Sequence, residues 1–298
     1  MLLHAAIIVE ERCISNCALT ALGCCVISTY SATRQTCQFC AAPCMAVYLT
    51  GENSRFEGIV AIYLDSAIPG EARQAFALGF VGGITTNPFL LSSVSAAPGD
   101  VIRELCHICP GTVFYQLAAS TVLERGTEAT RILRLNQQLQ CEVSGVRRED
   151  SSQDATSPVP SCGRVGLKIP ATTENMALVN EFASQGTIVA VTAIFSLAQA
   201  YAACEAGATY VLPYVNRFTR LCGDGIGFVR DLTHVCKSAA QGTEVLAASI
   251  KSPVEAVQAL LAGAHHVSMP LSILQAMGHH PLSDQAVAEF ERMKSSRA

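Results

Sequence analysis

The stretch TIVAVTAIFSLAQAYAACEAGATYVLP (residues 187–213) decides the fold, because two short β-rich runs flank one helical segment within it. The runs 187–193 and 208–213 carry Val, Ile, Thr and Tyr, which favour strands, whereas 196–205 has Ala and Leu at helical spacing. A strand, a helix and a second strand in this order predict a βαβ unit of a parallel sheet. Parallel strands are covered on both faces, which explains why these runs are largely apolar.

The same alternation extends from about residue 58 to the end of the chain. Further candidate strands lie at 59–64, 81–85, 112–117, 164–169, 243–248 and 265–269. Helix-like segments between the strands include 70–79, 121–138, 172–184, 226–239 and 253–262. Eight strands with intervening helices predict one α/β domain at 58–298, a (β/α)8 TIM barrel, since such barrels occupy about 250 residues. A last helix at 283–294, with Ser283 available as its N-cap, is expected outside the barrel proper.

Two segments do not follow this alternation. Residues 1–57 show no clear period and are assigned to an N-terminal extension. Residues 139–163 are rich in Ser, Pro and charge, a composition that predicts an exposed or disordered insertion. This insertion enters at the N-terminal end of a strand, on the face away from a barrel's active site, so the fold can tolerate it.

Charge and hydropathy patterns argue against several classes of partner. The net charge of −4, with no cluster of five or more basic residues, predicts no binding to nucleic acid. Residues 13–33 carry no charge, but polar residues interrupt them and no basic segment starts them. This pattern predicts neither a signal peptide nor a membrane segment. We therefore expect a cytoplasmic protein whose partner is a small molecule.

The cysteines suggest thiols rather than disulfides or a metal site. Seven of the 14 crowd into residues 13–44, and the others are scattered singly. Without a framework spacing in so long a chain, most are expected to be reduced core residues. Cys37, Cys40 and Cys44 include a CxxC pair of the kind that binds zinc, yet no second pair with ligand spacing follows. We therefore expect no metal.

Polar residues lie at the ends of the predicted strands. In a parallel barrel the working side chains lie at the C-terminal ends of the strands, where the βα loops meet. Reading only those positions gives Asp65, Thr85 with Asn87, Gln116, Lys168, Thr192, Tyr214 and Ser249. Strand ends face solvent, so any one of these residues could be polar by chance. Seven consecutive strands with this feature favour an active site.

Lys168 is the sharpest candidate, because GLKIP (166–170) places an amine inside an apolar strand. Desolvation disfavours the ammonium form, so such a lysine can act as a nucleophile near neutral pH. The alternative is a lysine whose stem packs in the strand while its amine reaches water.

The other strand-end residues have plain alternatives too. Asp65 either shuttles protons or caps the next helix. In TTNP (85–88), either Asn87 holds substrate hydroxyls or the segment is a turn in which Pro88 starts a helix. Three others are expected to position a catalytic water, although each is ordinary at a strand end: Gln116, Thr192 and Tyr214.

A phosphate site is expected at the loops after the late strands. Arg217 in PYVNRF, the turn 223–225, and Ser249 with Lys251 in AASIK supply cations, a hydroxyl and helix N-terminal amides. Such groups bind phosphate in many barrel enzymes. The alternative for Arg217 is a solvated surface cation.

Together these segments resemble the transaldolase and fructose-6-phosphate aldolase family over about residues 60–290, interrupted by 139–163. The motifs that carry the resemblance are collinear: YLDSA (63–67), GGITTNPFLL (82–91), GLKIP (166–170), VTAIFSLAQA (191–200), AGATYVLPYVNRF (206–218), EVLAASIKSP (244–253) and LLAGAHHVSMPLSIL (260–274). Departures include the insertion, the N-terminal extension and the pair Ile68–Pro69, where an Ala-Asn-like pair is usual in the family.

The resemblance implies that Lys168 forms an imine with a ketose carbonyl and retains a dihydroxyacetone unit as an enamine. No metal or organic cofactor is then needed. The residues that would relay protons through a water are Asp65, Gln116, Thr192 and Tyr214. Those that would bind the sugar phosphate are Thr85, Asn87, Arg217, Ser249 and Lys251.

Two positions indicate the subfamily. Transaldolases carry Glu where Gln116 stands and Phe where Tyr214 stands, so the resemblance favours an aldolase acting on a phosphoketose such as fructose 6-phosphate. The alternatives are a transaldolase that passes the dihydroxyacetone unit to an aldose phosphate, and a non-catalytic sugar-phosphate-binding barrel. The family forms ring-like homo-oligomers that exchange a C-terminal helix, which implies a homo-oligomer with 283–294 as a subunit contact.

Overall fold

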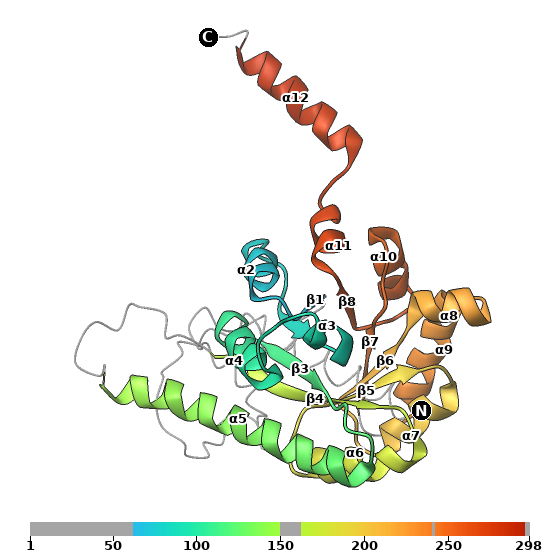
Figure 1. Ribbon diagram of the computed structural model, residues 1–298. Helices are drawn as coiled ribbons and strands as arrows, with labels where there is room; N and C mark the ends of the chain where they lie inside the picture. The colour runs from blue at the N-terminus through green and yellow to red at the C-terminus, as the bar shows by residue number, and fades with distance from the viewer. Residues whose placement is uncertain (1–61, 150–161, 240–241, 296–298) are drawn as a thin grey trace, which may run out of the picture. The chain divides into compact units, whose positions relative to one another are not determined.

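The structure, a computed structural model, describes residues 62–149, 162–239 and 242–295, with only the backbone at 142–149. The extension predicted at 1–57 lies outside the described residues, as do residues 150–161 of the predicted insertion. In the described part, eight parallel strands pair in sequence order and close on themselves (Figure 1). The prediction of a (β/α)8 TIM barrel is confirmed.

Each strand coincides with one of the predicted runs. The strands are β1 Ile62–Asp65, β2 Gly83–Thr85, β3 Thr112–Gln116, β4 Arg164–Pro170, β5 Val189–Ile194, β6 Tyr210–Pro213, β7 Glu244–Ala247 and β8 His266–Met269. The polar residues expected at strand ends therefore all lie on one end of the barrel, where the βα loops begin.

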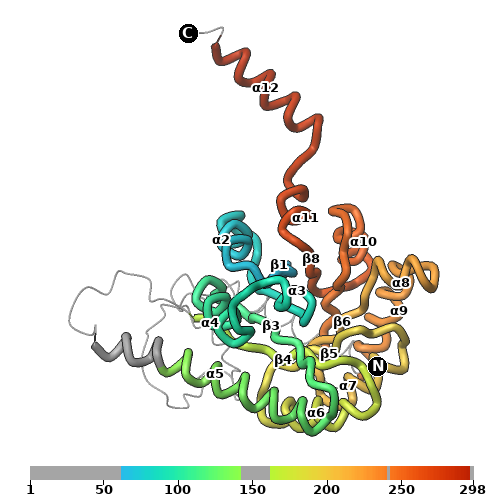
Figure 2. The backbone as a smooth tube through the Cα atoms, in the orientation of Figure 1, coloured from blue at the N-terminus to red at the C-terminus, as the bar shows by residue number. Residues whose placement is uncertain are grey.

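Helices follow the strands, and most of them lie around the barrel, whereas the last helix extends away from it (Figure 2). They are α2 Pro69–Ala77, α3 Pro88–Ser92, α4 Pro98–Ile108, α5 Val122–Glu149, the 3-10 helix η1 Thr173–Asn175, α6 Met176–Ser184, α7 Leu197–Glu205, α8 Val215–Cys222, α9 Gly225–Ser238, α10 Pro253–Leu261, α11 Leu271–Ala276 and α12 Pro281–Ser295. Several of these helices begin at N-cap residues whose side chains bond to the first turn. Ser196 and Gln199, for example, form a capping box at α7.

Two helices differ from the sequence-based expectation. Helix α5 continues through 139–149, into the segment assigned to an insertion, because Ile132, Leu135 and Leu139 keep its apolar face buried at helical spacing. Helix α12 begins at Pro281, so Ser283 lies inside the first turn instead of capping it, and its amide donates to the carbonyl of His280 at 2.9 Å.

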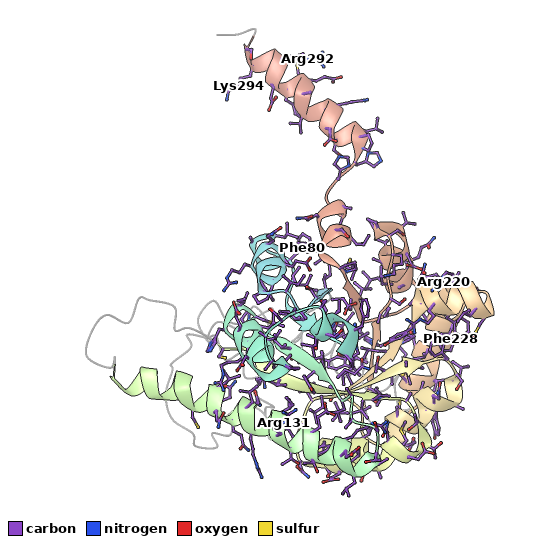
Figure 3. The ribbon with its side chains drawn as sticks, in the orientation of Figure 1. Phe80, Arg131, Arg220, Phe228, Arg292 and Lys294 are labelled. Atoms are coloured by element: carbon purple, nitrogen blue, oxygen red, sulfur yellow. The ribbon has the colours of Figure 1, made fainter. Side chains whose placement is uncertain are left out.

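Figure 3 shows how densely the side chains fill the barrel region. Alternation along the strands divides them into an outer and an inner set. Outward residues such as Leu64, Leu167 and Val211 join the core under the helices. A second, smaller cluster fills the middle of the barrel: Tyr63, Phe114, Ala190, Leu212, Leu246 and Ala248. This apolar layer supports the polar strand ends above it.

Two glycines make room for the aromatic rings of the middle layer. A Cβ on Gly166 would lie 2.6 Å from the Phe114 ring, and one on Gly83 would lie 2.3 Å from the Tyr63 ring. Such distances are far below van der Waals contact. A large ring on one strand is therefore accommodated by a glycine on the neighbouring strand. Gly166 lies two residues before Lys168 on the same strand.

Helix α12 has no buried residue, and its apolar side chains Leu282, Val287 and Phe290 are exposed. Among the helices described, none is long and apolar enough to cross a membrane.

Gly166→Ala should lower the free energy of unfolding by about 1–3 kcal/mol, the usual effect of overpacking a core. The matched control is Gly99→Ala in α4, where a Cβ would have nothing within 4 Å, and which should be neutral or slightly stabilising. Denaturant unfolding measures both. Equal stability of the two variants would contradict the packing described for the barrel interior.

Candidate active site

The predicted catalytic residues form the top layer of the barrel interior. Asp65 pairs in register with Thr85, Gln116 with Lys168, and Pro170 with Thr192. Tyr214 follows β6 and bridges to Ala248 after β7. Strands that are far apart in sequence therefore present these side chains at the same end of the barrel, where the βα loops begin.

Lys168 is only 3% exposed, and its amine does not reach water. The flanking Leu167 and Ile169 point outward into the helix-facing core, which turns Lys168 into the barrel. Its Nζ donates to the carbonyl oxygen of Thr86 at 3.1 Å. Burial lowers the pKa of Lys168, and the negative charge of Asp65 raises it only in part. A neutral amine near physiological pH is what a nucleophilic lysine requires.

Asp65 ends β1 and is held by its neighbour on β2. The Thr85 hydroxyl donates to Asp65 Oδ1 at 2.9 Å and lies 2.6 Å from the hydroxyl of Ser268 on β8. The alternative role considered for Asp65 was to cap the helix that follows, α2. Ile68 occupies the cap position instead, and no side chain caps that helix. The carboxylate thus remains with the barrel interior.

The loop TTNP forms the helix start that was considered for it. Asn87 Oδ1 accepts from the amide of Leu90 at 3.0 Å and caps α3, while Pro88 is the first residue of that helix. Only the Nδ2 group of Asn87 is then left to serve a ligand. Thr86 is anchored by two hydrogen bonds to the carbonyl of Phe114, at 2.8 and 3.1 Å, which fixes the carbonyl that receives Lys168.

Thr192 and Tyr214 meet at the far side of the layer. The Thr192 hydroxyl donates to Tyr214 Oη at 3.3 Å. A register shift after Thr192 leaves Ala193 outside the pairing with a φ of 59°, a left-handed conformation that is uncommon for alanine. This bulge keeps Thr192 inside while Ile194 packs outside with no exposure. The guanidinium of Arg217 lies 5.0 Å above the Tyr214 ring, a cation–π contact.

Gln116 contributes a buried acceptor. Its Oε1 has no hydrogen-bond partner among the described residues. A buried carbonyl oxygen without a donor is costly, and functional sites are where such atoms are found. Gln116 lies level with Lys168 on the neighbouring strand. It can therefore accept a hydrogen bond from a molecule bound at the amine.

Of the phosphate candidates, Arg217 lies in the first turn of α8 after β6, and Ser249 and Lys251 lie on the loop after β7. Arg217 and Lys251 are exposed, and Ser249 has a φ of 63°, again left-handed for a residue with a side chain. Glu255 ties these two segments together, since its carboxylate accepts from Asn216 Nδ2 at 3.2 Å and from the Lys251 amide at 2.6 Å. Strain at Ser249 is of the kind found at ligand clamps.

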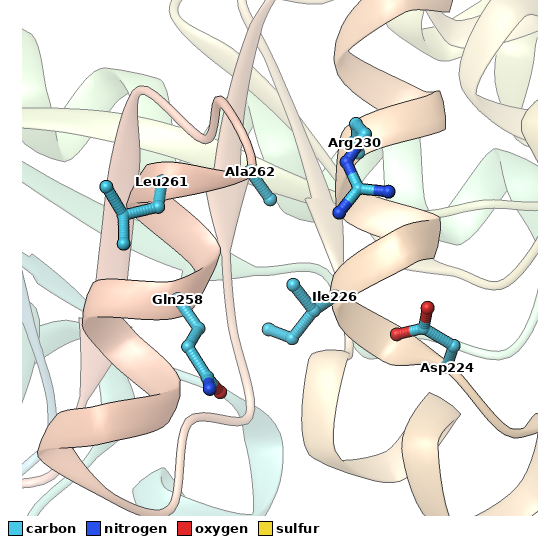
Figure 4. A pocket seen from close by; sticks show the side chains of 6 residues that line it. All are labelled: Asp224, Ile226, Arg230, Gln258, Leu261 and Ala262. Atoms are coloured by element: carbon cyan, nitrogen blue, oxygen red, sulfur yellow. The ribbon is translucent and has the colours of Figure 1, made fainter.

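The turn 223–225 does not join this cluster. Asp224 Oδ1 already accepts from the amide of Gly227 at 2.8 Å, so the N-terminus of α9 is capped by a carboxylate of the chain itself. Asp224 instead lines a groove of about 440 Å³ between α9 and α10, with Arg230, Gln258 and Leu261 among the other lining residues (Figure 4). The Gly-rich turn, considered as part of a phosphate site, is a helix connection.

Sequence analysis missed two contributors to the site. Thr86 takes part through its carbonyl oxygen, which no side-chain pattern signals. Ser268 could have been found, because it is the inward-facing polar residue of HVSM in an otherwise apolar strand.

Lys168→Met should stabilise the fold, because Met keeps a long side chain without an amine that must be stripped of solvent. We expect the free energy of unfolding at neutral pH to rise by about 1–2 kcal/mol, the usual range of stabilising changes. Denaturant unfolding measures it, with Lys237→Met on the exposed face of α9 as control.

The pH dependence of that gain identifies its cause. The folded chain holds Lys168 with a lowered pKa while the unfolded chain keeps the ordinary 10.5, so the unfolded wild-type chain binds more protons between these values. Wild-type stability therefore rises relative to Lys168→Met as pH rises through this window, and the gap narrows toward pH 10.5. A pH-independent gap would contradict the burial of a neutral amine.

Comparison with known proteins agrees with this geometry. A family model described as Transaldolase/Fructose-6-phosphate aldolase matches residues 62–298. A "Probable transaldolase" of Herpetosiphon aurantiacus is 35% identical over 77% of this chain and 92% of its own length. Proteins of the same name from Sorangium cellulosum and Anaeromyxobacter dehalogenans are 32% and 30% identical over 77% and 76% of this chain, and 94% and 93% of their own. The chain belongs to the transaldolase/fructose-6-phosphate aldolase family and is an enzyme of the transaldolase or aldolase type.

Proposed function

We propose that the protein is a class I aldolase that cleaves or forms a carbon–carbon bond in a phosphoketose such as fructose 6-phosphate, through a Schiff base on Lys168. The observation that carries the proposal is the buried amine, 3% exposed, with a pKa lowered by desolvation. Few other roles explain a lysine at the centre of a barrel, because a buried ammonium group is destabilising. No metal or organic cofactor is part of the proposed reaction.

In the cleavage direction, Lys168 Nζ attacks the C2 carbonyl of the ketose and water leaves, giving a protonated imine. A base takes the proton of the C4 hydroxyl, the C3–C4 bond breaks, and its electron pair moves toward the imine nitrogen. The aldehyde phosphate departs and an enamine of dihydroxyacetone remains. Protonation at C3 and hydrolysis release dihydroxyacetone and restore the amine.

Proton transfer is assigned to the residues that surround the amine. Asp65, held on Oδ1 by Thr85, is the carboxylate that takes and returns protons. A water between Gln116 Oε1 and the linked pair Thr192 and Tyr214 would supply the proton for the enamine. The buried, unpaired Gln116 oxygen and the 3.3 Å contact between Thr192 and Tyr214 support this assignment.

Substrate binding is assigned to the loops. Asn87 Nδ2 would hold sugar hydroxyls, because its oxygen is used by the α3 cap. Thr85 acts through Asp65 instead of touching the sugar, since its hydroxyl donates to that carboxylate. Arg217, Ser249 and Lys251 would hold the phosphate group. For this reason we propose a phosphorylated sugar as the substrate.

Transaldolase activity is the second candidate. The relatives from Herpetosiphon aurantiacus and Sorangium cellulosum, each named a probable transaldolase, favour it. Gln116 and Tyr214 favour the aldolase, because an amide and a phenol can orient water for direct protonation of the enamine. Family membership sets aside the third hypothesis, a barrel without activity.

We also propose a cytoplasmic homo-oligomer. The exposed apolar residues of α12, Leu282, Val287 and Phe290, support an intersubunit contact through this helix.

Incubation with fructose 6-phosphate alone should release dihydroxyacetone and glyceraldehyde 3-phosphate, and added erythrose 4-phosphate should not be needed. Coupled enzymatic detection of each product measures this. The control is Lys168→Met, which should lose at least about 1,000-fold in rate because the nucleophile is gone. Product that forms only with erythrose 4-phosphate would assign the protein to the transaldolases, and turnover by Lys168→Met would overturn the Schiff base.

A further inference from the structure

The barrel interior holds a polar side chain that the proposed reaction does not use directly. Ser268 on β8 is 1% exposed and pairs in register with Tyr63 of β1, so it lies one layer below Asp65. The barrel interior also holds an apolar cluster that includes Phe114, Leu212 and Leu246. A hydroxyl at this level is unfavourable unless it is hydrogen-bonded.

The partner of Ser268 is the Thr85 hydroxyl, 2.6 Å away, and the direction of this bond follows from the proton count. A threonine hydroxyl carries one proton, and Thr85 donates it to Asp65 Oδ1 at 2.9 Å. Thr85 must therefore accept from Ser268. The chain of hydrogen bonds runs from Ser268 through Thr85 to Asp65.

A hydroxyl that accepts a hydrogen bond becomes a stronger donor, and it can no longer rotate freely. The Ser268 proton thus keeps the Thr85 proton on one oxygen of Asp65 and leaves the other oxygen available for the reaction. We propose that Ser268 is a positioning residue, which acts through Thr85 to hold Asp65 in the orientation for proton transfer. This inference rests on the proposed function, in which Asp65 moves protons.

The kinetic test compares Ser268→Ala, Ser268→Thr and a control. Ser268→Ala should lower kcat for fructose 6-phosphate about five-fold, the value of one neutral hydrogen bond, with KM unchanged because Ser268 does not touch the sugar. Ser268→Thr keeps the hydroxyl and should restore kcat. Thr233→Ala removes another buried hydroxyl, which donates to the Val229 carbonyl at 2.8 Å in α9, and should leave kcat unchanged.

A double-mutant cycle tests the route through Thr85. In a Thr85→Val background the chain is already broken, so Ser268→Ala should cause no further fall in kcat. The inference is overturned if Ser268→Ala has wild-type kcat, if Ser268→Thr is as slow as Ser268→Ala, or if the two losses simply multiply.

The four proteins of the double-mutant cycle are the wild type, Ser268→Ala, Thr85→Val and the double variant. They also separate this inference from the proposed function. Their thermal unfolding midpoints should also be non-additive, because Ser268 and Thr85 share one buried hydrogen bond whether or not the sugar reacts. Wild-type protein that leaves fructose 6-phosphate intact, with or without erythrose 4-phosphate, refutes the proposed reaction, and additive midpoints then refute the hydrogen-bond chain as well.

Discussion

Burial of the Lys168 amine inside a closed barrel is the constraint on which the rest of the structure depends. An amine in an apolar environment stays neutral because the ammonium form loses its hydration there. The eight strands close around β4, and among the described residues Nζ donates one hydrogen bond, to the Thr86 carbonyl at 3.1 Å. The reactivity proposed for this position therefore depends on the whole barrel, and we expect the buried amine to lower stability.

The layers of the interior divide the tasks of folding and chemistry. In the middle layer, the Phe114 ring fits against Gly166, which lies two residues before Lys168 on β4. In the top layer, neighbouring strands contribute hydroxyl, carboxylate and amide groups that hold one another. Gln116 Oε1 is the exception, because it is buried and has no hydrogen-bond partner among the described residues. It is therefore available to accept a hydrogen bond from a bound molecule.

Much of this arrangement could be predicted from the sequence, because βα units carry strong local patterns. All eight strands follow from short apolar, β-rich runs that alternate with helical segments, and Lys168 stands out as an amine within one of these runs. What could not be predicted depends on contacts between distant segments. Asn87 caps α3, Asp224 in the turn 223–225 caps α9, and the Thr85 hydroxyl donates to Asp65. The reach of α5 to Glu149 was hidden by a polar composition, although Leu135 and Leu139 continue its apolar face.

The most direct test of the central claim is to trap the imine. Incubation with dihydroxyacetone and borohydride, followed by trypsin and mass spectrometry, should place one reduced three-carbon unit on Lys168. Trypsin does not cleave after a modified lysine, so the adduct should appear on the peptide 165–217 in place of 165–168 and 169–217. Release of 165–168 unmodified, with the label absent or on another lysine, would contradict the account.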